Sequence, residues 1–256
     1  MTISLSVLAS GSKGNSVYLE GPEGALLIDA GLSARETIKR IETVGADPGF
    51  VRGIIVTHEH SDHMGGVKVV ARRLKIPVYA TRKTAGAASL PDDVQVRLIE
   101  SGTSFEAAGF EIMPFSIPHD ALDPVGFTAK LDSIRVGVAT DLGCATALVR
   151  ERLIECRAVV LESNHDEKML MEGPYPWFLK QRVKGRTGHL SNEAAARMLN
   201  DLSSTDLQHV FLAHLSEINN APDLALGTAR EALAGYGTDL EAASPTAPTR
   251  RVFLER

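Results

Sequence analysis

Residues 54–66 bring together side chains that bind metal ions. After an apolar run the segment contains four of them, His58, His60, Asp62 and His63. Residues 58, 60 and 62 share one face of an extended chain, and His63 turns to the other side where the strand ends. Imidazole and carboxylate groups are good ligands for zinc, iron and manganese. The spacing therefore predicts a metal site, and a polar loop with scattered surface histidines is the alternative.

Short apolar runs rich in valine and isoleucine predict the strands that position this segment and others. These runs are 5–9, 17–19, 26–28, 53–56, 78–80, 110–115, 136–139, 158–161 and 210–213. Helical spacing of apolar residues predicts helices at 33–44, 65–75, 191–202 and 222–234. Strands recur in both halves, and helices follow each half. We therefore predict an α/β fold of two mixed sheets packed face to face with helices outside, a four-layer αββα sandwich.

The length fits one large domain or two small ones, and the absence of a short-period repeat or a long linker indicates a single domain over residues 1–256. The loop-like stretch 237–249 precedes a last strand in RVFLER. A net charge of −5 excludes a wholly basic nucleic-acid binder. Two cysteines, Cys144 and Cys156, suit a reducing compartment. We find no secretory signal, and no apolar run approaches the roughly 20 residues that span a bilayer. We expect a soluble cytoplasmic protein that binds no membrane, with its oligomeric state left open.

The HxHxDH pattern after a strand resembles the signature of the metallo-β-lactamase superfamily. Further motifs of that family follow in order, and the matching residues are Asp29, His119, Asp141 and His214. The resemblance covers nearly the whole chain, and it implies the superfamily's four-layer fold.

The resemblance also implies two divalent metal ions, which would be zinc, manganese or iron. One would be held by His58, His60 and His119. The other would be held by Asp62, His63 and His214. Asp141 would bridge the ions and Asp29 would orient a ligand. A hydroxide between the ions would attack an anionic substrate, with Asp62 positioning or deprotonating the water.

The turn GSKGNS at residues 11–16 follows the first predicted strand. Its backbone N–H groups could face a phosphate, which makes Ser12, Gly14 and Asn15 candidate contacts, and a simple hairpin turn is the alternative. The turn resembles the LASGSxGNS opening of the YycJ/WalJ-type branch of the superfamily, whose members are DNA exonucleases.

The segment GHLSN begins with Gly188 and His189, and it resembles the His-Ser-Thr segment of tRNA 3′-processing endonucleases. Those enzymes pair it with a glutamate, which Glu162 matches here, although Leu190-Ser191 replaces Ser-Thr. Cleaving a phosphodiester expels an alkoxide, and a carboxylate-held histidine can protonate it. The alternative is a helix-start histidine near solvent.

Residues 175–186 combine aromatic and basic side chains just ahead of His189. They could stack on bases and contact phosphates, with Lys180 and Arg182 as candidate contacts. The alternative is an amphipathic surface segment whose aromatic side chains lie in the core. The roles of His165 and Cys144 stay open.

These features predict a two-metal phosphodiesterase in which His189 and Glu162 assist the leaving group, and the resemblance to the YycJ/WalJ-type branch implies a 5′-to-3′ DNA exonuclease. The alternatives are a small-molecule phosphodiesterase acting on cyclic or nucleotide-like diesters, an RNA-processing nuclease, and a non-catalytic metal-binding scaffold. A complete ligand set with an added acid pair argues against the scaffold.

Overall fold

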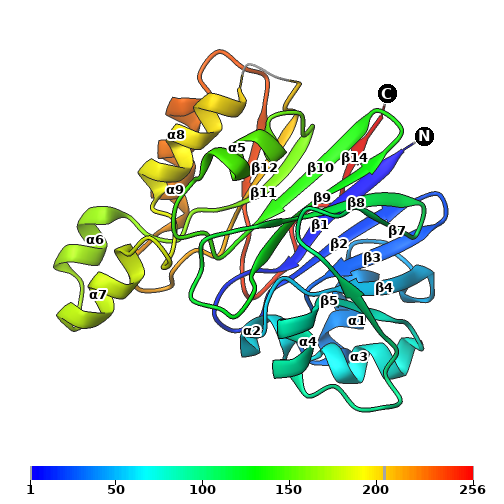
Figure 1. The fold of residues 1–256 in the computed structure, drawn as a ribbon. Helices are drawn as coiled ribbons and strands as arrows, with labels where there is room; N and C mark the ends of the chain where they lie inside the picture. The colour runs from blue at the N-terminus through cyan, green and yellow to red at the C-terminus, as the bar shows by residue number, and fades with distance from the viewer. Residues whose placement is uncertain (1, 204–205, 256) are drawn as a thin grey trace.

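Two sheets of seven strands face each other in the computed structural model, which describes residues 2–203 and 206–255 (Figure 1). The order in the first sheet is β14 (Val252–Leu254), β1 (Ile3–Ala9), β2 (Ser16–Gly21), β3 (Gly24–Ile28), β4 (Val51–Ile55), β5 (Val78–Thr81) and β6 (Val96–Ile99). The order in the second sheet is β13 (Asp239–Ala242), β12 (His209–Ala213), β11 (Ala158–Glu162), β10 (Ile134–Ala139), β9 (Val125–Leu131), β8 (Phe110–Ser116) and β7 (Phe105–Ala107).

Both sheets are mixed in the same way. β1 to β3 pair antiparallel and β3 to β6 pair parallel in the first sheet. β7 to β10 pair antiparallel and β10 to β13 pair parallel in the second sheet. Each sheet therefore presents the carboxyl ends of several parallel strands at one edge, which is where open α/β sheets bind ligands.

Three layers of buried apolar side chains hold the four layers of secondary structure together. The central layer joins the inner faces of the two sheets, for example Leu5 and Val7 with Phe127 and Phe211. A second layer lies under α1 (Ala34–Thr43), α3 (Val67–Leu74) and α4 (Arg82–Ala88). A third lies under α5 (Ala147–Leu153), α8 (Asn192–Leu202) and α9 (Pro222–Ala232). The predicted αββα sandwich is confirmed.

The helix boundaries follow from local side-chain chemistry. Ser33 accepts a hydrogen bond from the Glu36 backbone at the start of α1, and Ser191 accepts one from Ala194 at the start of α8. Pro222 occupies the first turn of α9, where its missing N–H has no helical partner to lose. None of the described helices is long and apolar enough to cross a membrane.

Several sequence expectations were incomplete or wrong. The runs that form β6, β7, β9 and β13 were not predicted, and β13 lies inside the stretch 237–249 that was expected to be a loop. β13 is a short edge strand with no fully buried residue, so its sequence lacks the apolar signal. β4 ends at Ile55, so His58 and His60 lie on a loop, and Asp62 and His63 lie on α2 (Ser61–Met64) rather than on an extended chain.

Candidate metal centre

The candidate site lies where the parallel strands of the two sheets end. β10, β11 and β12 lead to Asp141, Glu162 and His214, and Glu162 is the last residue of its strand. β3 and β4 lead to Asp29 and His58 in the facing sheet. The topology therefore gathers polar side chains from distant parts of the chain at one edge.

Three of these residues have left-handed backbones. The φ angles of Asp29, Asp141 and His214 are 61°, 56° and 56°, and each residue comes one or two positions after a strand ends. Such a conformation costs a non-glycine residue roughly 1–3 kcal/mol and is concentrated at functional sites.

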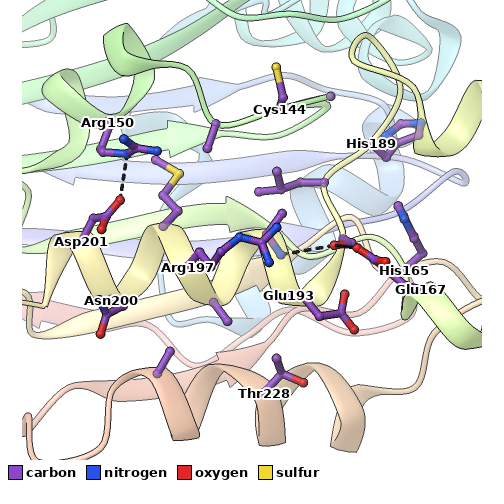
Figure 2. A pocket seen from close by; sticks show the side chains of 18 of the residues that line it. Cys144, Arg150, His165, Glu167, His189, Glu193, Arg197, Asn200, Asp201 and Thr228 are labelled. Atoms are coloured by element: carbon purple, nitrogen blue, oxygen red, sulfur yellow. Dashed lines mark hydrogen bonds and ion pairs between the residues drawn. The ribbon is translucent and has the colours of Figure 1, made fainter.

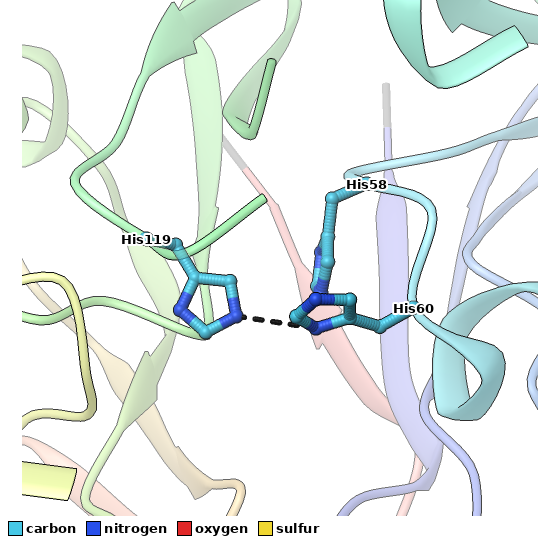
Figure 3. A group of neighbouring side chains, drawn as sticks. All are labelled: His58, His60 and His119. Carbon is cyan, nitrogen blue, oxygen red and sulfur yellow. Dashed lines mark hydrogen bonds between the residues drawn. The ribbon is translucent and has the colours of Figure 1, made fainter. Parts of the chain in front are cut away.

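Four overlapping groups of potential ligand atoms occur here among the described residues, with the atoms of each group within 4.8 Å of one another. One group is His58, His60 and His119 (Figure 3). A second is Asp62, His63 and His214. A third is His58, His63 and Asp141, and a fourth is Asp141, Glu162, His189 and His214. The structure thus brings together all seven residues that the sequence predicts as ligands, with Asp141 shared between groups.

Hydrogen bonds fix the orientation of the buried histidines on the first sheet's side. His63 donates from Nδ1 to Asp29 Oδ2 at 2.7 Å, because a carboxylate only accepts. Asp29 also accepts from the Thr57 backbone and hydroxyl, each at 2.8 Å. The Thr57 oxygen in turn lies 2.9 Å from Nδ1 of His58. Asp29 therefore lies behind the ligand groups and belongs to none of them.

The histidines that face them are held in the same way. Nδ1 of His119 lies 3.2 Å from the carbonyl oxygen of Gly188. Nδ1 of His214 lies 3.0 Å from Glu162 Oε1. Both acceptors require a proton on Nδ1, so Nε2 is the nitrogen available to a metal ion.

The inward-facing atoms form a set that fits metal ions. Nε2 of His58, Nε2 of His214 and Oδ2 of Asp141 are buried and have no hydrogen-bond partner among the described residues. Nδ1 of His60 faces Nε2 of His119 at 3.4 Å (Figure 3). Buried polar atoms are rarely left unpaired, and an imidazole fixed at one nitrogen is the usual form of a metal-binding histidine. The protein therefore has a centre suited to divalent metal ions.

Charge at the centre is consistent with this fit. Burial lowers the pKa of His214, but Asp141, Asp62 and Glu162 outweigh burial and raise it to about 10. Burial raises the pKa of Asp141, but His214 and His63 outweigh it and hold that pKa well below its usual range. The carboxylates thus stay ionised beside positively charged histidines, whose protons divalent cations would replace.

The turn at residues 11–16 has a different use from the one predicted. Asn15 is buried, and its Nδ2 lies 3.0 Å from Asp62 Oδ2 and 3.0 Å from His63 Nε2. Its backbone N–H donates to the Asp62 carbonyl at 2.7 Å. Asn15 therefore positions two candidate ligands.

In the same turn, two of the N–H groups that were expected to face a phosphate have partners within the protein. The N–H groups of Gly11 and Gly14 donate to the Asn15 side chain and to the Gly11 carbonyl, so the turn satisfies them internally. The Ser12 side chain is exposed at the surface of the turn.

Close backbone contact fixes the position of α2, which carries Asp62 and His63. A Cβ at Gly31 would lie 1.7 Å from the Asp62 carbonyl oxygen, and one at Gly66 would lie 1.8 Å from that of Leu32. Only glycine permits this approach.

Glu162 contacts both His189, the predicted acid for the leaving group, and His214, a predicted metal ligand, which the sequence analysis treated separately. It is fully buried, and Oε1 lies 2.8 Å from Nδ1 of His189 and 3.0 Å from Nδ1 of His214. Oε2 accepts from the backbone of Leu142 at 2.6 Å and of Leu190 at 3.0 Å. Burial raises the pKa of Glu162, but His189 and His214 outweigh burial and lower it to about 2. Because Nδ1 of His189 is bound to this carboxylate, Nε2 is the nitrogen left for a substrate.

Two of the predicted phosphate contacts, Lys180 and Arg182, lie on α7 (Trp177–Lys184). Lys180 and Lys184 are four residues apart and share one face of α7, whereas Arg182 lies on another face and Arg186 lies beyond the helix, so the alternating pattern does not form a single row. Arg182 forms an ion pair with Asp120 at 2.6 Å, and Lys180 donates to the Met171 carbonyl at 2.6 Å. Trp177 and Phe178 are exposed, so the alternative that buried them in the core is wrong.

A cavity of about 770 Å³ opens beside His189 (Figure 2). His165 and Cys144 line it, and neither belongs to a candidate ligand group. His165 is buried, and burial lowers its pKa to about 4.

Sequence reasoning missed Thr57, and it missed the contacts of the Asn15 side chain with Asp62 and His63. Thr57 contacts Asp29, His58 and His63, yet a threonine beside the histidine motif carries no signal of its own.

Comparison with known proteins identifies the family. The model of the beta-lactamase superfamily domain matches residues 25–214. The exodeoxyribonuclease YycJ of Bacillus anthracis is 36% identical, over 99% of this chain and 100% of that protein. The exodeoxyribonuclease WalJ of Streptococcus pneumoniae is 35% identical, over 92% of this chain and 91% of that protein.

A solved structure shows the same fold. The metallo-beta-lactamase fold protein YhfI from Bacillus subtilis superimposes with a TM-score of 0.73 at 13% identity, over 97% of this chain and 99% of that one. The family resemblance inferred from the HxHxDH motif and the GSKGNS turn is confirmed. The chain belongs to the beta-lactamase superfamily, in the branch that contains the exodeoxyribonucleases YycJ and WalJ.

Proposed function

We propose that the chain is a two-metal phosphodiesterase that degrades DNA from the 5′ end. The observation that carries the proposal is the position of His189. It is held by a buried carboxylate, and that same carboxylate orients the candidate ligand His214. An acid for the leaving oxygen thus lies beside a centre built for metal ions. The names of the curated relatives support DNA as the substrate.

The ligands divide between two zinc, manganese or iron ions. His58, His60 and His119 would hold one ion. Asp62, His63 and His214 would hold the other, with Asp141 between them. When bound, the ions supply an activated water and neutralise charge on the phosphoryl oxygens.

The chain's own residues would then position the attacking water and protonate the leaving oxygen. Asp62, fixed by the Asn15 side chain, would orient the attacking water. His189 would donate a proton from Nε2 to the oxygen that leaves phosphorus. Glu162 accepts the Nδ1 hydrogen of His189 and stabilises the imidazolium before transfer. A scaffold protein would have no use for this pair.

The test is digestion of end-labelled DNA by purified enzyme with added manganese. We expect linear DNA to be degraded from its 5′ end while a covalently closed circle resists. Equal rates of cleavage of closed circular and linear DNA would show that the enzyme is an endonuclease and not an exonuclease. The same assay on end-labelled RNA tests the RNA-processing alternative. Turnover of bis(p-nitrophenyl) phosphate without a preference for polynucleotide would favour a small-molecule phosphodiesterase.

A further inference from the structure

The helices α6 (Glu167–Glu172) and α7 form an arm, residues 167–186, that extends from the sandwich (Figure 1). α6 is anchored by the buried Leu170, whereas α7 has no buried residue. Two adjacent aromatic side chains lie on the first turn of α7, with Trp177 63% exposed and Phe178 72% exposed. A single exposed aromatic side chain is ordinary, but adjacent ones that form a contiguous apolar patch are typical of a binding surface.

The base of the arm is bound to the rim of the metal centre. Arg182 forms an ion pair with Asp120, the residue after the candidate ligand His119. The backbone N–H of Asp120 donates to the carbonyl of Thr187, and that of His189 donates to the carbonyl of Val183. The last turn of α7 thus joins both His119 and His189, and the arm has a fixed place beside the reacting groups.

The charge of the arm differs from that of the rest of the chain. Residues 167–186 contain five basic and two acidic side chains, whereas the whole chain has a net charge of −5. Lys168 and Arg186 are exposed and have no ion-pair partner among the described residues. An exposed aromatic pair within a basic surface is the combination that binds single-stranded nucleic acid, because bases stack on the rings while cations contact phosphates.

We infer that the arm is a stacking platform for single-stranded DNA, which holds the substrate strand several nucleotides from the bond being cleaved. This inference rests on the proposed function and adds the form of DNA that the enzyme prefers. The eight residues of α7 span about 12 Å at the usual helical rise. If the strand is base-stacked as in B-DNA, at roughly 3.4 Å per nucleotide, that length corresponds to three or four nucleotides between the aromatic pair and the base of the arm.

The intrinsic fluorescence of the protein reports on this contact directly, because Trp177 is its only tryptophan. The experiment titrates wild-type protein with oligothymidylate in EDTA, which prevents cleavage. We expect the DNA to quench the fluorescence. Steady-state degradation of single-stranded DNA with manganese is then compared for wild type, Trp177→Ala and Phe178→Ala. Each variant should raise KM by about ten-fold while kcat changes little, since one lost stacking contact accounts for such a factor.

Phe253→Ala is the matched control, because Phe253 is 58% exposed and lies on β14 at the outer edge of the first sheet. This variant should keep the wild-type KM. Metal content and turnover of bis(p-nitrophenyl) phosphate, which is too short to reach the arm, report whether each variant retains an intact centre.

The inference fails if oligothymidylate leaves the fluorescence unchanged, or if the arm variants keep the wild-type KM. A response only to vesicles containing phosphatidylglycerol would also overturn it and make the arm a membrane contact. Quenching by DNA in a protein that does not cleave DNA would support the platform and reject the proposed function. The two claims are therefore separable.

Discussion

Replacement of Glu162 by glutamine tests whether one carboxylate serves both His189 and the metal centre. The change swaps one carboxylate oxygen for an NH₂ group in a site where four donors converge. Whichever way the amide points, its NH₂ faces two of these donors. Each unsatisfied buried donor costs about 1–3 kcal/mol, so the loss of stability should be roughly 2–6 kcal/mol. For a chain of this size that lowers Tm by roughly 5–20 °C.

Activity should fall on every substrate, because a neutral amide holds both His214 and His189 more weakly than the carboxylate does. Loss of a partner that orients a metal ligand typically costs about 10–100-fold in metal affinity or activity. The assays are thermal unfolding, elemental analysis of the purified variant, and turnover of both DNA and bis(p-nitrophenyl) phosphate. An unchanged Tm would show that the four hydrogen bonds do not contribute as described. Full metal content with a defect on DNA alone would show that Glu162 acts only through His189.

Three further substitutions separate the parts of the site. His189→Ala should slow DNA turnover by roughly 100-fold or more and retain metal, while bis(p-nitrophenyl) phosphate, whose phenolate leaves unprotonated, loses much less; an equal loss on both would point to phosphate binding. Wild type should carry two ions per chain by elemental analysis. Asp141→Ala should lose at least one of these ions, and its activity should fall by more than about 100-fold. A single ion in fully active wild type would contradict this. Gly31→Ala should displace the Asp62 backbone, lower stability by about 1–3 kcal/mol and reduce metal content. Gly227→Ala, where a Cβ meets no atom within 4 Å, should do neither.

The candidate ligands could be predicted from sequence because their signals are local. Four of them lie within six residues, and the others each follow a strand whose apolar run is visible in the sequence. The layered fold could be predicted for the same reason, since alternating strands and amphipathic helices bury only one set of faces. The strands β7 and β13 escaped because short, half-exposed edge strands lack that apolar signal.

The contacts among these residues depended on the tertiary structure. The sequence paired Glu162 with His189, but only the parallel alignment of β11 and β12 places His214 on the same carboxylate. Asn15 looked like a phosphate contact in an isolated turn, and packing of that turn against α2 directs its amide to Asp62 instead. The sequence of α7 does not show whether its aromatic side chains are buried or exposed. The position of the arm in the fold determines that they are exposed. The sequence by itself thus determined which chemical groups the site contains. Long-range packing determined which of these groups contact one another, because hydrogen bonds depend on three-dimensional distance and not on spacing along the chain.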